Sequence, residues 1–161
     1  MKRKLLTALG VIGLAVAGSA LAAGNAAHDH GHAAAETTRL ELNAGKKWET
    51  DAALRKAMES IRQTMAASLR DIHENRVSAA AYGKLAHKVE GEVGQIVANC
   101  KLEPRADAQL HLIVAELLDG AEQMAGKPKQ AKRMNGAVKV IGALEKYSAY
   151  FDDPGFKPIR H

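Results

Sequence analysis

The sequence predicts an all-α protein: an antiparallel, up-down-up-down bundle of four helices with a flexible N-terminal extension. Three observations lead to this fold. Large apolar residues recur in steps of three and four along four segments of roughly 20 residues each. Short stretches with proline, glycine or helix-capping residues separate these segments, and short connections favour antiparallel neighbours. No run of alternating apolar and polar residues competes as a strand.

The first helix is predicted from Thr50 or Asp51 to about Glu74. Either side chain can act as the N-cap, because its oxygen can accept a hydrogen bond from an amide of the first turn. The stripe beyond the cap comprises Leu54, Met58, Ile61, Met65, Ser68 or Leu69, and Ile72. The preceding stretch, "LELNAGKKWET", is expected to pack onto this helix, with Trp48 covering one end of the bundle.

The second and third helices are predicted to meet at Pro104. The second begins near Ser78, and Glu103 should end it, because the residue before a proline is pushed out of the α region. Its stripe is Tyr82, Ala86, Val89, Val93, Ile96 and Cys100. Pro104 suits the first turn of the third helix. The stripe of that helix is Leu110, Ile113, Val114, Leu117, Leu118, Ala121 and Met124.

The fourth helix is predicted from about Gln130, after the helix-breaking stretch "AGKPKQ", to the stretch "DDPGF". Its expected apolar stripe is Met134, Val138, Ile141, Leu144, Tyr147, Ser148 and Phe151. The bundle should therefore occupy residues 39–153. Residues 154–161 are expected to form a loose C-terminal tail.

The N-terminus predicts export. "MKRK" is a basic start, "LLTALGVIGLAVAG" is too short an apolar stretch to span a bilayer with margin, and "SALA" is a small-residue cleavage site. Residues 1–22 are therefore expected to be a signal peptide cut after Ala22. Three of the five net positive charges lie in this leader, and the small remainder, together with export, argues against a nucleic-acid partner. We expect a periplasmic protein without stable membrane insertion.

An antiparallel order of helices would bring a methionine, a cysteine and a histidine to one end of the bundle. Met58 lies near the start of the first helix, Cys100 at the end of the second and His111 near the start of the third. Cysteine and methionine sulfur suits Cu(I), and imidazole suits copper, zinc, iron or nickel. The same residues also fit core packing, because Met58 and Cys100 lie on apolar stripes and a lone buried cysteine behaves as a small hydrophobe. Both interpretations stay open.

Residues 23–38 are predicted to be a flexible tail, because they are small and polar and show no apolar periodicity. They contain "HDHGH", in which His28, His30 and His32 occupy alternate positions. Short histidine-rich tracts are associated with metals, and this one could chelate Cu(II), Ni(II) or Zn(II) without specifying one of them. The tail is therefore a second candidate metal site, with a soluble spacer as the alternative.

The stretch "LRKAMESIRQTM", in a chain with a leader and four helices, resembles the periplasmic b-type cytochrome bundle and the cytochrome c-prime group. The resemblance implies that Met58 matches the family's methionine haem ligand. The chain departs from both groups, since "LEKYSAYFDDP" has tyrosines where the b-type family has its histidine ligand, and no C-x-x-C-H motif occurs. "LNAGKKWETDAALRKAM" and "ANCKLEPRADAQLH" are also similar to a group of exported proteobacterial proteins of uncharacterised activity.

Several short motifs typical of enzymes are absent from the sequence: G-x-S-x-G, H-E-x-x-H, a glycine-rich phosphate loop and C-x-x-C. We therefore expect a non-enzymatic periplasmic protein that binds a transition metal, copper first. One alternative is a metal-free envelope protein that works by contacts, with a second copy of the chain or another periplasmic protein as its partner. The other is an electron-transfer protein with b-type haem.

Overall fold

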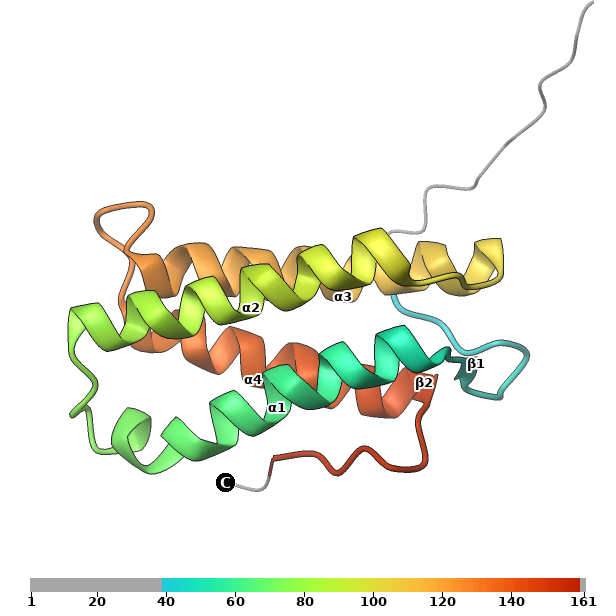
Figure 1. Ribbon diagram of the computed structural model, residues 1–161, viewed down its shortest axis with the longest axis horizontal. Helices are drawn as coiled ribbons and strands as arrows, with labels where there is room; N and C mark the ends of the chain where they lie inside the picture. The colour runs from blue at the N-terminus through green and yellow to red at the C-terminus, as the bar shows by residue number, and fades with distance from the viewer. Residues whose placement is uncertain (1–38, 160–161) are drawn as a thin grey trace, which may run out of the picture. The chain divides into compact units, whose positions relative to one another are not determined.

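A computed structural model describes residues 39–159 of the chain. All of these residues belong to one compact unit. Four helices lie side by side along its long axis (Figure 1). They are α1 (Ala52–His73), α2 (Ala79–Asn99), α3 (Pro104–Ala125) and α4 (Arg133–Tyr150). The predicted all-α fold with four helices is confirmed.

The helix starts follow local signals that the sequence shows. The Asp51 side chain caps α1, the Ser78 side chain caps α2, and Pro104 is the first residue of α3. Two predicted boundaries are wrong. Helix α2 ends at Asn99, because Cys100 is extended and the next amide bonds to the Asp51 carboxylate. Helix α4 begins at Arg133, because turns occupy the residues before it.

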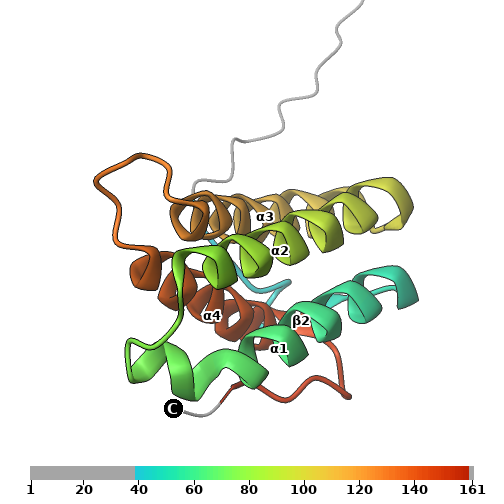
Figure 2. The same cartoon turned by 60° about the vertical axis from the view of Figure 1, so that its left-hand side comes forward.

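A small sheet of two strands, each two residues long, joins the segment before the first helix to the segment after the last. Strand β1 (Trp48–Glu49) precedes α1 and pairs in parallel with β2 (Phe151–Asp152), which follows α4. Trp48 pairs with Phe151, so the start of α1 lies beside the end of α4, as Figure 2 also shows. The sequence does not predict these strands, because two residues carry no periodicity and the pairing exists only once the helices have packed.

The four helices are amphipathic, and their buried faces form one core that includes Leu54, Met58, Ile113, Leu117 and Leu144. Helices α3 and α4 lie close together where Gly120 faces Gly136. A Cβ atom placed on Gly136 would lie 2.5 Å from the Gly120 carbonyl oxygen, so neither position has room for a side chain. Within residues 39–159, no helix is both long enough and apolar enough to cross a membrane.

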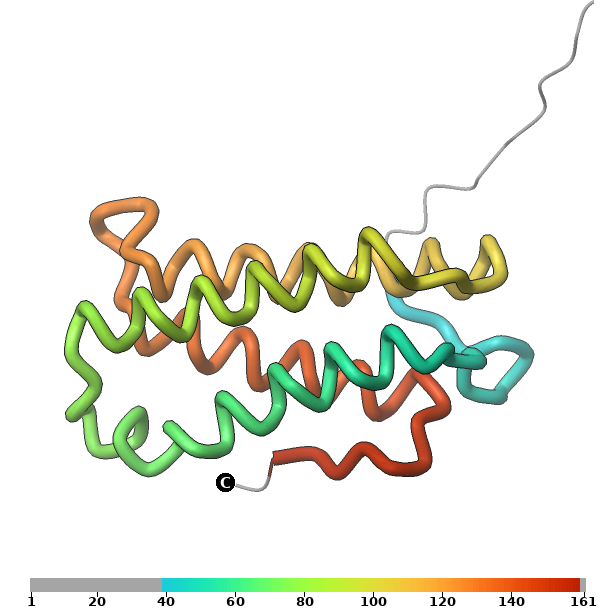
Figure 3. The backbone as a smooth tube through the Cα atoms, viewed as in Figure 1, coloured from blue at the N-terminus to red at the C-terminus, as the bar shows by residue number. Residues whose placement is uncertain are grey.

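The segment after β2 turns back along α1 (Figure 3). Phe156 and Ile159 are buried, and the Phe156 ring packs edge-on against Tyr147 with 5.0 Å between centroids. The Tyr147 hydroxyl donates a hydrogen bond to Asp153. The expectation of a loose tail is therefore wrong for residues 154–159, because two apolar side chains anchor this segment to the core. Residues 160–161 lie outside the described part.

Candidate functional site

The Asp51 carboxylate fastens three segments together at one end of the bundle. It accepts hydrogen bonds from the amide of Leu54 at 2.7 Å, from the amide of Lys101 at 2.6 Å, and from the Cys100 thiol. Burial raises the pKa of Asp51, but these hydrogen bonds outweigh burial and hold the pKa below its ordinary value of 3.8. Asp51 therefore stabilises the fold at neutral pH, and this contribution is lost as the pH falls through the lowered pKa.

Cys100 is held as a neutral thiol at this junction. It is the C-cap of α2 and is partly buried. Burial raises the pKa of the thiol to about 12, and the negative charges of Asp51 and Asp107 add to the effect. A metal ion binds the thiolate and must displace this proton, so Cys100 is poorly prepared to act as a ligand.

Alkylation of Cys100 at pH 8 should be slow. Because only the thiolate reacts, a thiol pKa near 12 implies a rate about a thousand-fold below that of an ordinary cysteine. The measurement is the iodoacetamide rate as a function of pH for the folded chain, with the urea-unfolded chain as the reference. Asp51→Asn removes a neighbouring negative charge and should raise the rate. Equal rates in the folded and unfolded chains at pH 8 would show that the thiol is not protected.

His111 and Met58 have opposite environments. The His111 side chain is 73% exposed on α3, and its Nδ1 donates to the Asp107 carbonyl oxygen at 2.8 Å. Met58 is fully buried in the core of the bundle. The predicted set thus consists of a core thioether, a protonated thiol and a surface imidazole. Asp107 lies near the last two: its negative charge raises the pKa of the Cys100 thiol, and its carboxylate is 3.5 Å from Nδ1 of His111.

A hollow of about 260 Å³ opens beside this junction. Trp48 lines it, and the indole nitrogen of Trp48 donates to the Glu41 carbonyl while the Arg105 guanidinium lies 5.4 Å from the ring centroid. Glu49, Asp51 and Glu103 also line the hollow. Within the part of the chain that the structure describes, no three histidine, cysteine, aspartate or glutamate side chains are arranged to hold a metal ion. The tail candidates His28, His30 and His32 lie outside that part.

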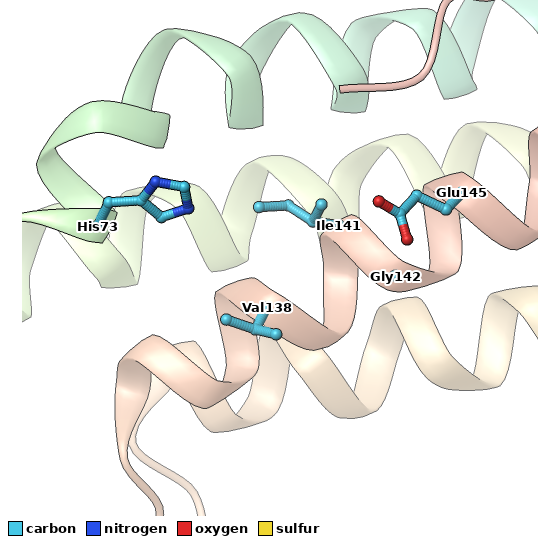
Figure 4. A pocket seen from close by; sticks show the side chains of 5 residues that line it. All are labelled: His73, Val138, Ile141, Gly142 and Glu145. Atoms are coloured by element: carbon cyan, nitrogen blue, oxygen red, sulfur yellow. The ribbon is translucent and has the colours of Figure 1, made fainter. Parts of the chain in front are cut away.

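The structure reveals a surface on α4 that the sequence analysis missed. Met134 and Val138 were expected in the core, but Met134 is 36% and Val138 57% exposed. Val138 and Gly142 line a hollow of about 150 Å³, with His73 of α1 at one end and Glu145 at the other (Figure 4). The "α4 strip" consists of Met134, Val138 and Gly142, which are spaced by four residues and share one helix face.

Small residues explain the error. The buried face of α4 is Gly136, Ala137, Val140, Ile141, Ala143, Leu144 and Tyr147. The largest apolar residues of this segment, Met134 and Val138 among them, indicate a buried face that differs from this one. The available signal was glycine and alanine at helical spacing, which permits close approach to α3.

Comparisons of the chain with family models, with curated proteins and with solved structures found no match.

Proposed function

We propose that this chain is an exported, periplasmic, non-enzymatic protein that binds a transition metal, copper first, through His28, His30 and His32. The observation that carries the proposal is the run "HDHGH", which places three imidazoles and a carboxylate within five residues. Imidazole is a good ligand for copper, and a histidine-rich tract needs no preformed pocket. The folded part would be the stable carrier of this segment.

The carrier in this proposal is an up-down-up-down antiparallel bundle. Contacts between the ends of the helices support that order. The β1–β2 pair joins the start of α1 to the end of α4, and Asp51 joins the start of α1 to Lys101, two residues after α2. At the start of α4, the Arg133 guanidinium donates to the Met124 carbonyl near the end of α3.

The bundle-end set is the weaker candidate for the metal. Cys100 would have to lose a proton that burial and Asp51 hold on its sulfur, and Met58 would have to be reached inside the core. His111 offers only its exposed Nε2, because Nδ1 already donates to a carbonyl. We therefore place the copper ligands in the tail.

Titration of the purified chain with Cu(II) against a competing chelator tests this placement. Replacing His28, His30 and His32 with alanine should weaken binding by about a hundred-fold or more. Cys100→Ser and His111→Ala should leave the affinity unchanged. His87→Ala is the matched control, because His87 is an exposed histidine that contacts Glu90 on α2.

Two results would overturn the placement. If the triple alanine variant binds Cu(II) as tightly as the unchanged chain, the tail is not the site. If Cys100→Ser or His111→Ala causes the larger loss, the ion lies at the end of the bundle instead.

The second candidate function is a metal-free envelope protein that works by contacts, and the exposed Val138 between two hollows on α4 favours it. Electron transfer with b-type haem ranks last. Met58 is fully buried, and no histidine occurs within α4 to serve as the second ligand found in the resembled family.

A further inference from the structure

The α4 strip combines a projection and a recess. Val138 projects with more than half of its side chain exposed. One helical turn further on, a Cβ atom added to Gly142 would meet nothing within 4 Å, so the surface there is open. A second hollow, of about 450 Å³, lies on the α3 side and is also lined by Val138 and Gly142. The strip is thus an apolar ridge with hollows along both flanks.

The α4 strip has a shape that can pair with the α4 strip of a second copy of the chain. Consider a two-fold axis that lies in the interface between two copies, perpendicular to α4 and over its surface halfway between Val138 and Gly142. Two copies of α4 would then run antiparallel, and Val138 of each copy would face Gly142 of the other. A two-fold interface uses the same patch on both copies. The projection of each copy therefore enters the recess of the other, and the contact is made twice.

The polar side chains beside the strip favour the same arrangement. His73 and Glu145 lie at opposite ends of the smaller hollow (Figure 4). The two-fold axis reverses one copy, so His73 of each copy would face Glu145 of the other. On the other flank, Lys139 is paired with Asp119 and Lys146 with Glu116, so that flank brings no excess of like charge. Complementary polar and charged groups fix orientation and register in protein interfaces.

We propose that this protein forms a homodimer through the α4 strip, with the two copies of α4 antiparallel and Val138 of each seated over Gly142 of the other. A second copy of the chain would then be the partner in the second candidate function, and the dimer would form whether or not copper is bound.

Sedimentation equilibrium of the full chain tests the dimer. The buffer should contain EDTA, so that metal bridges between histidine segments cannot join two copies. The unchanged chain should shift from monomer to dimer as the concentration rises to about 1 mM. Val138→Glu places two carboxylates at the interface and should raise the dissociation constant at least tenfold. Gly142→Leu fills the recess and should act in the same direction.

Val97→Glu is the matched control, because Val97 is a 76% exposed valine on α2, away from the strip. It should leave dimerisation unchanged, and all three variants should keep the helical circular dichroism of the unchanged chain. A chain that stays monomeric throughout, or a dimer that Val138→Glu does not weaken, overturns the proposal. An equal loss with Val97→Glu overturns it too. Copper titration of Val138→Glu keeps the two proposals separate, because that variant should bind copper normally.

Discussion

Replacing Phe151 with alanine should lower the free energy of unfolding by about 3–5 kcal/mol. Phe151 is fully buried, stacks on Tyr147 with 5.5 Å between ring centroids, and pairs with Trp48 through the backbone. Truncation would leave a cavity at the point where β1, β2 and the end of α4 meet. Urea unfolding followed by circular dichroism measures the effect, with an unchanged m-value expected.

Val97→Ala is the control for this prediction, since it truncates an exposed side chain and should change stability by less than about 0.5 kcal/mol. If Phe151→Ala costs no more than Val97→Ala, the ring is not packed in the core and the end of the bundle is not closed in the described way.

Replacing Gly136 with alanine should destabilise the fold by about 2 kcal/mol, although alanine is the better helix former. The added Cβ would lie 2.5 Å from the Gly120 carbonyl oxygen and 2.6 Å from the Met124 amide nitrogen. Both are backbone atoms, so relief requires α3 and α4 to move apart along a buried contact. The melting temperature should fall by several degrees, because each kcal/mol corresponds to about 4 °C at this chain length.

Gly94→Ala is the matched control, because Gly94 lies within α2 and an added Cβ there would meet nothing within 4 Å. It should stabilise the protein by up to about 1 kcal/mol through helix propensity alone. Opposite signs for the two glycines would support the close contact of α3 with α4. The same stabilisation at both would contradict it.

Features of the fold that depend on neighbouring residues were predictable. The sequence predicts a cap at Thr50 or Asp51, a helix start near Ser78 and another at Pro104. In the structure Asp51 and Ser78 are the N-caps of α1 and α2, and Pro104 begins α3. The β1–β2 pair and the packing of residues 154–159 join segments far apart in the sequence. Their partners are adjacent only after the helices have assembled, so no local pattern indicates them.

At the candidate site, the residues were predictable from the sequence but their contacts were not. The sequence indicates Cys100 and His111 by their chemistry and predicts both at one end of the bundle. It did not predict that the Cys100 thiol donates to Asp51 or that His111 donates to a backbone carbonyl. The Cys100 contact depends on α2 ending at Asn99, which lets the amide of Lys101 reach Asp51. The His111 contact lies within α3. These contacts are the reason for placing the copper ligands in the tail.

X-ray absorption at the copper edge, on the chain loaded with one equivalent of copper as Cu(I) and as Cu(II), tests that placement most directly. We expect nitrogen and oxygen scatterers with the outer-shell pattern of imidazole, unchanged by Cys100→Ser and lost when His28, His30 and His32 are alanine. A sulfur scatterer that disappears in Cys100→Ser or Met58→Leu would contradict the account and place the ion in the bundle.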